Sequence, residues 1–156
     1  MVTLEPMTPE VWVRWRAGTI AGYARDQVRV GGWQAEGAED RAAATLAVLL
    51  PDGQSTADHQ FKSVLNEDGV IVGALWFAPE RGDGRRAIFI WDIVIARDFR
   101  GRGYGRATLA ALEPIARAMG YDEISLHVFG DNQVARDLYR SAGYVETNVS
   151  MVKRLG

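Results

Sequence analysis

Residues 88–106 read IFIWDIVIARDFRGRGYGR, and the character of this stretch changes halfway along. Residues 88–96 are almost all apolar or β-branched, which is typical of a strand covered on both faces. Residues 100–106 are basic and rich in glycine, and a helical pattern begins near Gly103. The stretch therefore predicts a central strand, a tight turn and the start of a helix, in that order.

The turn has the properties of an anion-binding loop. The first turn of a helix leaves backbone N–H groups without partners, and these carry the positive end of the helix dipole. Glycines let a diphosphate approach the main chain, and guanidinium groups match phosphate geometry. The candidate residues are Arg100, Gly101, Arg102, Gly103, Tyr104, Gly105 and Arg106. A structural turn with solvated arginines is the alternative interpretation.

Two familiar phosphate-binding motifs are absent. GxxxxGK[ST] cannot occur here, because the chain has no lysine between Lys62 and Lys153. The dinucleotide motif GxGxxG fails because position 106 is an arginine. A nucleotide-binding α/β domain is therefore the weakest of the functional hypotheses.

The glycine run matches the [R/Q]xxGxG/A signature of the GNAT superfamily of acyl-CoA-dependent N-acetyltransferases, with Arg100, Gly103 and Gly105 in the defining positions. Two longer blocks resemble the family in order and spacing: IVIARDFRGRGYGRATL (93–109) and ISLHVFGDNQVARDLYRSAGY (124–144). Together they cover roughly the last 70 residues, and the first part of the chain is less distinctive. The resemblance implies one N-acetyltransferase domain that uses acetyl-CoA as co-substrate and no metal.

The resemblance also implies the fold class: α/β (α+β mixed), with a sheet of about seven strands, mostly antiparallel, a splayed central parallel pair and helices on both faces. Hydrophobic patterns along the chain give the compatible order βααβββαβαββ. The expected strands are 2–4, 60–65, 70–78, 88–96 and 123–128, with a terminal strand or hairpin over 144–153. The expected helices run from Pro9 to before Gly31, over 34–50, from near Gly103 to Gly120, and over 131–142. Turns are expected at 66–69 and 79–84, and Pro114 should kink the third helix or end it near Glu113.

If the resemblance holds, the acyl donor lies along the central strand. Ile93, Val94 and Ile95 would offer main-chain groups to the pantetheine arm, as they would to another strand. The glycine loop would hold the pyrophosphate. A main-chain group of the same strand could polarise the thioester carbonyl.

The second block supplies Asn132 and Tyr139, which are about two helical turns apart and so face the same way. In the family, the matching Asn contacts the cofactor and the matching Tyr protonates the departing thiolate. The acidities of a phenol and a thiol are close enough for this role. Without the resemblance, the Asn would be interpreted as a helix cap and the Tyr as a core residue.

Two residues are candidates for the base that deprotonates the amine. His127 lies in the strand before Asn132, and an imidazole titrates near neutral pH, although a partly buried structural histidine is the favoured interpretation. Asp92 is a carboxylate in an apolar strand, which requires a positive partner such as a loop arginine or the acceptor ammonium. His59 has no motif around it and is interpreted as a loop residue.

Composition narrows the remaining possibilities. A chain of 156 residues with 47% hydrophobic content is one ordinary globular domain, and the net charge of −2 gives no reason to expect nucleic acid. The lack of cysteine excludes an acyl-cysteine intermediate and suits a cytoplasmic location. No membrane segment is expected. The expected partners are acetyl-CoA and a small-molecule or peptide amine, and a homodimer is compatible with the sequence.

Two questions stay open at this stage. The preferred hypothesis is an N-acetyltransferase acting by direct transfer in a ternary complex, and the alternative is a non-catalytic acyl-CoA binding or sensing module with the same fold. The aromatic face of the first helix, which includes Trp12 and Trp15, could line an acceptor pocket or simply be core. Neither the acceptor nor the acyl-chain preference is encoded in a recognisable motif.

Overall fold

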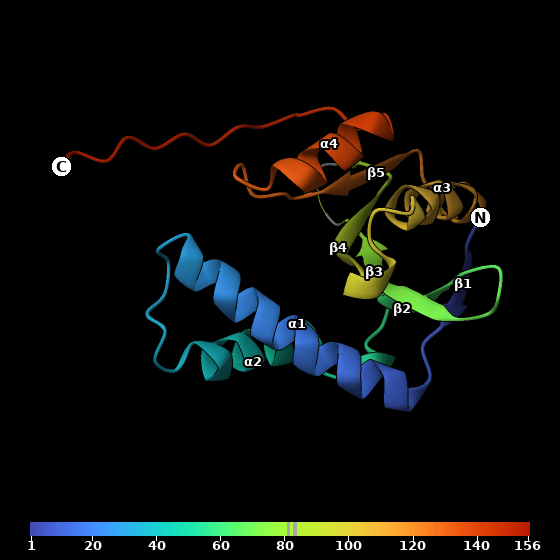
Figure 1. Ribbon diagram of the computed structural model, residues 1–156, viewed down its shortest axis with the longest axis horizontal. Helices are drawn as coiled ribbons and strands as arrows, with labels where there is room; N and C mark the ends of the chain where they lie inside the picture. Colours follow the sequence, from blue (N-terminus) through green and yellow to red (C-terminus); the bar gives the residue numbers. More distant parts are fainter. Residues whose placement is uncertain (81, 83) are drawn as a thin grey trace.

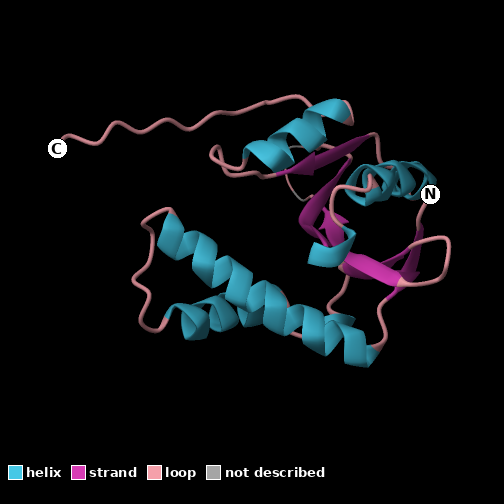
Figure 2. Ribbon diagram, in the orientation of Figure 1, coloured by secondary structure: helices cyan, strands magenta, loops and turns pink. Residues whose placement is uncertain are grey.

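The computed structural model describes residues 1–80, 82 and 84–156, so Arg81 and Asp83 of the expected turn 79–84 lie outside the described residues. The described chain forms a five-stranded mixed sheet between two layers of helices (Figure 1, Figure 2). The strands are β1 (Thr3–Pro6), β2 (Gln60–Leu65), β3 (Ile71–Pro79), β4 (Ala87–Ile95) and β5 (Glu123–Leu126). The helices are α1 (Pro9–Arg29), α2 (Ala38–Leu49), α3 (Tyr104–Ala118) and α4 (Gln133–Ser141), with short 3-10 turns η1 (Gly53–Ser55) and η2 (Arg97–Phe99).

The sheet has the spatial order β1-β2-β3-β4-β5. Neighbours from β1 to β4 are antiparallel, and β4 and β5 are parallel through the crossover that contains α3. The expected meander and the parallel pair are therefore confirmed. None of the helices among the described residues is long and apolar enough to cross a bilayer.

The expected number of strands is wrong: the structure has five and not seven. The missing strands belong to the expected terminal strand or hairpin over 144–153, which has no regular structure. Beyond Tyr144 every side chain is exposed, and this segment pairs with none of the described strands.

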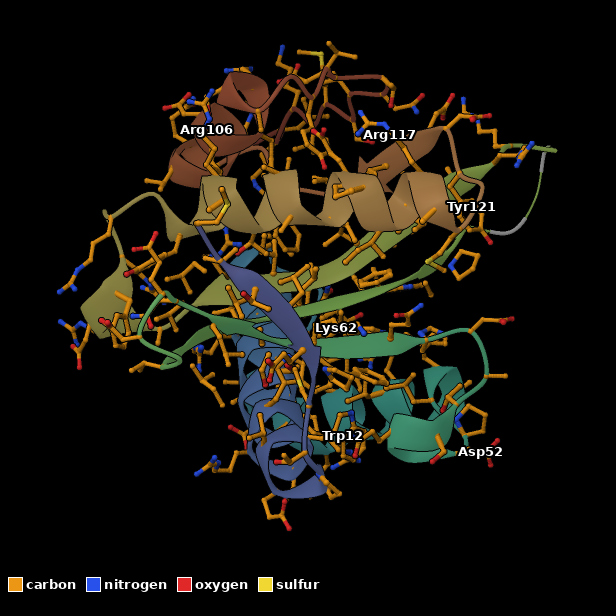
Figure 3. The ribbon with its side chains drawn as sticks, turned by 90° about the vertical axis from the view of Figure 1, so that its right-hand side faces the viewer. Trp12, Asp52, Lys62, Arg106, Arg117 and Tyr121 are labelled. Carbon is orange, nitrogen blue, oxygen red and sulfur yellow. The ribbon has the colours of Figure 1, made fainter. Side chains whose placement is uncertain are left out.

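The two faces of the sheet are covered by different helices, as expected. On one face, Trp15 of α1 and Leu46 of α2 pack on Phe61 and Trp76 of the sheet. On the other face, residues of α3 and α4 pack on Leu75, Phe77, Ile88 and Ile90. Figure 3 shows the two layers from the side, with Trp12 in one and Arg106 in the other.

The N-terminus of α1 follows from local chemistry. The Thr8 hydroxyl accepts a hydrogen bond from the Val11 N–H, and Pro9 occupies the first helical turn. The second helix begins at Ala38 and not at Gln34, because Gly37 adopts a left-handed conformation just before it. The third helix continues through Pro114 to Ala118, so the expected end near Glu113 is wrong. Pro114 is exposed, and water can bind the carbonyl that the proline leaves without an N–H partner.

A β-bulge divides β4 into two parts. Trp76 pairs with Asp92 and Phe77 pairs with Ile90, so Trp91 is an extra residue without a partner in β3. As a result, Asp92 shares a face with Trp76, toward α1, although a regular strand would place it on the same face as Ile90.

Close packing holds the second part of β4 against β3. Gly73 pairs with Ile95, and a Cβ at Gly73 would lie 2.3 Å from the carbonyl oxygen of Val94. Any side chain there would push the strands apart. Glycine at position 73 therefore fixes the end of β4, where the glycine loop begins.

Candidate functional site

The central feature of the site is the stretch of β4, residues 92–95, that pairs with β3 on one side and is unpaired on the side of β5. β5 pairs with β4 only from Ala87 to Ile90, and beyond Ile90 none of the described residues pairs with this edge of β4. The expected splayed strand pair is therefore present. Main-chain groups of Ile93, Val94 and Ile95 lie in this stretch, as the sequence predicts for a pantetheine-binding strand.

One of these groups already has a partner. The Nε of Arg100 donates a 2.9 Å hydrogen bond to the carbonyl oxygen of Ile95, which ties the glycine loop to the end of β4. The Arg102 guanidinium lies over the Phe99 ring at 5.5 Å. Arg100 and Arg102 are thus held by the protein while both side chains remain exposed.

The glycine loop is open at the start of α3. Gly101 and Gly103 have φ angles of 75° and 83°, which other residues adopt only with strain. A Cβ on either residue would meet nothing within 4 Å, so these glycines serve the backbone path and leave room above it. The N-cap residue Gly103 provides no side-chain hydrogen bond to the helix. The first N–H groups of α3 therefore face an uncovered space, which suits an anion.

Gly105 is predicted to belong to the anion-binding loop, but in the structure its role is in helix packing. Its φ is not positive, and a Cβ there would lie 3.1 Å from Cδ2 of Leu138. The missing side chain therefore makes room for α4 to pack against the start of α3. Tyr104 packs edge-on against Phe99, and Arg106 is exposed near the start of α3 (Figure 3).

Asp92 lies at the bulge, half-buried, and accepts a 2.9 Å hydrogen bond from the indole N–H of Trp15. Burial raises the pKa of Asp92 to about 6, although the Trp15 hydrogen bond works in the opposite direction. The sequence predicts a positive partner for Asp92, either a loop arginine or an ammonium ion. In the described structure the hydrogen-bond donor to this carboxylate is instead the neutral indole of Trp15.

Tyr139 is half-buried in α4, and its ring lies 5.9 Å from that of Tyr144. Burial raises the pKa of Tyr139, and the negative charge of Asp92 raises it further. The phenol is therefore protonated at neutral pH and can donate a proton.

Asn132 is the N-cap residue of α4, and its Oδ1 accepts a hydrogen bond from the Ala135 N–H. The structural interpretation of Asn132 as a helix cap is thus correct, and its role toward a cofactor stays a prediction.

His127 lies one residue beyond the end of β5, exposed, with its ring edge-on to Phe129 at 5.5 Å. The expected strand 123–128 is therefore shorter, and His127 is not inside it.

An aromatic wall lies on the face of the sheet toward which Asp92 points, and most of it is not evident from the sequence. We use this name for Trp15, His59, Trp76, Phe89 and Trp91. His59, which the sequence presents as a loop residue, accepts a 2.9 Å hydrogen bond from the Trp76 indole. The Trp76 and Trp91 rings stack at 5.4 Å, and Phe89 meets Trp91 edge-on at 4.9 Å. Trp91 exposes 44% of its surface, so the wall reaches solvent.

One sequence signal could have revealed part of this wall. Phe89, Trp91 and Asp92 lie within four residues of one strand, so aromatic side chains near the carboxylate could be predicted. Two hollows on the surface, one along residues 32–41 and one between β1 and α3, lie away from Asp92, Tyr139 and the glycine loop. The candidate site is therefore the free edge of β4 together with the start of α3.

Comparisons with known proteins agree with this geometry. The model of the acetyltransferase (GNAT) family matches residues 32–144. The chain is 38% identical to the uncharacterized N-acetyltransferase YycN of Bacillus subtilis, over 99% of both chains, and 30% identical to the N-acetyltransferase YdgE of the same organism, over 98% of both. The crystal structure of YycN superposes with a TM-score of 0.93 at 37% identity, covering 99% of each chain.

The splayed strand pair, the open glycine loop at the start of α3 and these whole-length similarities lead to one conclusion: this chain belongs to the GNAT family and is an N-acetyltransferase.

Proposed function

We propose that this chain transfers the acetyl group of acetyl-CoA to a primary amine by direct attack in a ternary complex, with Asp92 as general base and Tyr139 as general acid. The family uses acyl-CoA donors. The observation that carries the proposal is the pair of titratable groups beside the unpaired stretch of β4: a carboxyl with a pKa of about 6 and a phenol that stays protonated.

The donor would lie along two features of the site. The diphosphate of CoA would meet the N–H groups at the start of α3, with Arg102 and Arg106 beside it. The pantetheine arm would run along residues 93–95 as an added strand. The side-chain amide of Asn132, which caps α4 through its Oδ1, would contact the arm through Nδ2.

In the transfer step, the neutral amine attacks the thioester carbonyl and forms the new C–N bond. The tetrahedral intermediate then loses the C–S bond, and Tyr139 gives its proton to the departing thiolate. Asp92 receives the proton that the amine releases, directly or through water. A carboxylate with a pKa of about 6 is a stronger base than one at its ordinary value of 3.8, and it is still ionised at neutral pH.

Asp92 is better supported than His127 as the base. Asp92 is half-buried and its negative charge raises the pKa of Tyr139, whereas His127 is exposed beyond the end of β5. The same carboxylate also suits the acceptor before reaction, because a primary amine arrives as an ammonium ion. The indole face of Trp91, half-exposed next to Asp92, favours a cation as well.

Binding and turnover can be measured separately. Acetyl-CoA should raise the melting temperature, and at 100 times its Kd it would add about 2.7 kcal/mol to the stability of the fold. Free CoA should compete with it. Release of CoA thiol across a panel of primary amines should identify an acceptor.

Two results would argue against the proposal in different ways. If saturating acetyl-CoA gives no shift, the donor site is wrong. If the shift occurs but no amine in a broad panel releases CoA, the chain is a non-catalytic acyl-CoA binding or sensing module. In that case the Asp92 and Tyr139 assignments would be withdrawn.

A further inference from the structure

The face of the sheet that lies toward α1 is only partly covered. Trp15 of α1 packs on Trp76, but neither Phe89 nor Trp91 of β4 belongs to the hydrophobic clusters that pack beneath the helices. The Phe89 and Trp91 rings meet edge-on at 4.9 Å, and Trp91 exposes 44% of its surface. These two aromatic side chains therefore form an apolar surface that reaches solvent beside Asp92.

A second carboxylate lies at the other end of this aromatic surface. Ser125 of β5 pairs with Phe89 of β4, so the two side chains point to the same face of the sheet. The Ser125 hydroxyl donates a 2.6 Å hydrogen bond to Oε2 of Glu80, the residue that follows β3. The aromatic pair thus has Glu80 at one end and Asp92 at the other. We call Glu80, Phe89, Trp91 and Asp92 the acidic strip.

The two carboxylates of the acidic strip are held in the same way. Asp92 accepts a hydrogen bond from an indole and Glu80 accepts one from a hydroxyl, so both donors are neutral. Neither carboxylate forms an ion pair with another described residue. Both are half-buried, so each charge is partly removed from water without a cationic partner in the described chain. A ligand with two cationic groups supplies a partner to each.

We propose that the acceptor is a diamine or a polyamine, with the amine to be acetylated at Asp92 and a second ammonium group at Glu80. This assignment rests on the proposed acetyl transfer and names its substrate class. The hydrocarbon between the two nitrogen atoms lies against Phe89 and Trp91, because aromatic rings bind methylene groups and nearby cations. Glu80 then determines which amines are accepted and takes no part in the transfer step.

The dimensions and charge of the acidic strip narrow the acceptor further. The Glu80 carboxylate lies level with Phe89, because Ser125 pairs with that residue. From Phe89 to Asp92 the strand advances by three residues, one of them in the bulge, so the two carboxylates are roughly 7–10 Å apart along it. A chain of several methylene groups spans this distance, whereas ethylenediamine is too short. A second group that is negatively charged is repelled by Glu80.

The first test is the binding of amines to the protein saturated with free CoA, measured by isothermal titration calorimetry. Free CoA has no acetyl group to transfer, so the measurement does not depend on turnover. Hexamethylenediamine should bind about 10-fold more tightly than hexylamine, which has the same chain and a single amine. Ethylenediamine, and aminohexanoate with a carboxylate at its far end, should bind no better than hexylamine. Equal affinities for hexamethylenediamine and hexylamine would overturn the proposal.

The second test is Glu80→Gln, which removes the charge and keeps a side-chain oxygen for the Ser125 hydroxyl. This variant should bind hexamethylenediamine about 10-fold more weakly and should no longer distinguish it from hexylamine. Glu67→Gln is the matched control, because Glu67 precedes β3 and Glu80 follows its other end. The control should keep the wild-type preference, and both variants should keep the wild-type Kd for CoA, which shows that they are folded. A preference that persists in Glu80→Gln would refute the role of Glu80.

Turnover separates this proposal from the transfer function on which it rests. Both amines are offered to the wild type with acetyl-CoA, and release of the CoA thiol is followed. If they react with equal kcat/KM, the transfer function stands and the diamine assignment fails. If hexamethylenediamine binds preferentially and neither amine releases CoA, the recognition of a dication by the acidic strip stands and the transfer function fails.

Discussion

The indole N–H of Trp15 donates a 2.9 Å hydrogen bond to Oδ2 of Asp92, across 77 positions of the sequence. This bond joins α1 to the bulge of β4. Burial among aromatic residues would favour the neutral acid, and the indole donor stabilises the ionised form, so the pKa settles at about 6. The relationship keeps a half-buried carboxylate ionised at neutral pH without a positively charged partner.

Replacing Asp92 with Asn should remove the base and leave the donor site intact. We expect kcat to fall by about 10²–10⁴-fold with little change in the Kd for acetyl-CoA. In the wild type, kcat/KM should fall as the pH drops through about 6, where Asp92 becomes protonated. Asp98→Asn in η2, an exposed carboxylate, is the control. Full turnover in the Asp92 variant would transfer the role to His127, which His127→Gln would then test.

Asp92→Asn should lower turnover but raise the stability of the fold. Because the folded pKa of about 6 lies above the ordinary 3.8, the native state binds this proton more tightly than the unfolded chain does. The resulting stabilisation is complete below the ordinary pKa and is lost as the pH rises through the folded one. At neutral pH, Asp92→Asn should therefore raise the free energy of unfolding by roughly 1–3 kcal/mol. Denaturant titrations should show this difference shrinking in acid, and a variant less stable at neutral pH would contradict the argument.

Tyr139→Phe removes only the phenol oxygen. Turnover should fall by about 10²-fold because the thiolate departs without a proton, while the Kd for acetyl-CoA stays the same. Because the pKa of Tyr139 is raised, the wild type should keep this donor above the ordinary value of 10. Tyr121→Phe is the matched control, since Tyr121 is half-buried outside the site. Equal turnover in the Tyr139 variant would exclude the phenol from the mechanism.

Two glycine substitutions should change the stability of the fold in opposite directions. Gly103→Ala places a Cβ at φ 83°, which should cost roughly 1–2 kcal/mol and weaken acetyl-CoA binding by distorting the loop. Gly18→Ala fills open space on an exposed part of α1 and should stabilise the fold by roughly 1 kcal/mol without affecting the ligand. Thermal unfolding and calorimetric titration would measure both. Unchanged affinity in the Gly103 variant would count against the loop as the diphosphate site.

Trp91→Ala should affect the acceptor and spare the donor. Loss of the exposed indole beside Asp92 removes a surface for an ammonium ion, so the KM for the amine should rise by about 5–30-fold. The Kd for acetyl-CoA should not change. Trp33→Ala, an aromatic residue between α1 and α2, is the control. A rise in the Kd for acetyl-CoA alone would place Trp91 on the donor side instead.

Much of the fold could be predicted from sequence because its signals are local. The Thr8–Pro9 start of α1, the apolar run of β4 and the glycine turn each combine standard residues at standard spacing. The end of α3 is not predictable from Pro114 alone, because a proline on an exposed helix face costs less than one inside the protein. The terminal strand expected over 144–153 is wrong because a strand pattern alone does not reveal whether a neighbouring strand is available in the same chain.

The candidate site was only partly accessible from sequence. Arg100, Gly103 and Tyr139 stand in motifs with fixed spacing, so they could be found. Trp15 and His59 could not, because their contacts with Asp92 and Trp76 join distant parts of the chain. The packing role of Gly105 was hidden for the same reason, since Leu138 is its neighbour only in the folded state.

The bulge at Trp91 inserts one residue into β4 without turning over the side chains that follow it. Deleting Trp91 would make Ile90 and Asp92 consecutive residues of a regularly alternating strand, with the pairs Phe77–Ile90 and Trp76–Asp92 unchanged. The carboxylate of Asp92 would keep its place toward Trp15, and the strand would lose the exposed indole. A single deletion at this point should therefore preserve the fold and reduce only what Trp91 contributes, just as the exposed turn at Asn66 to Gly69 should tolerate changes in length.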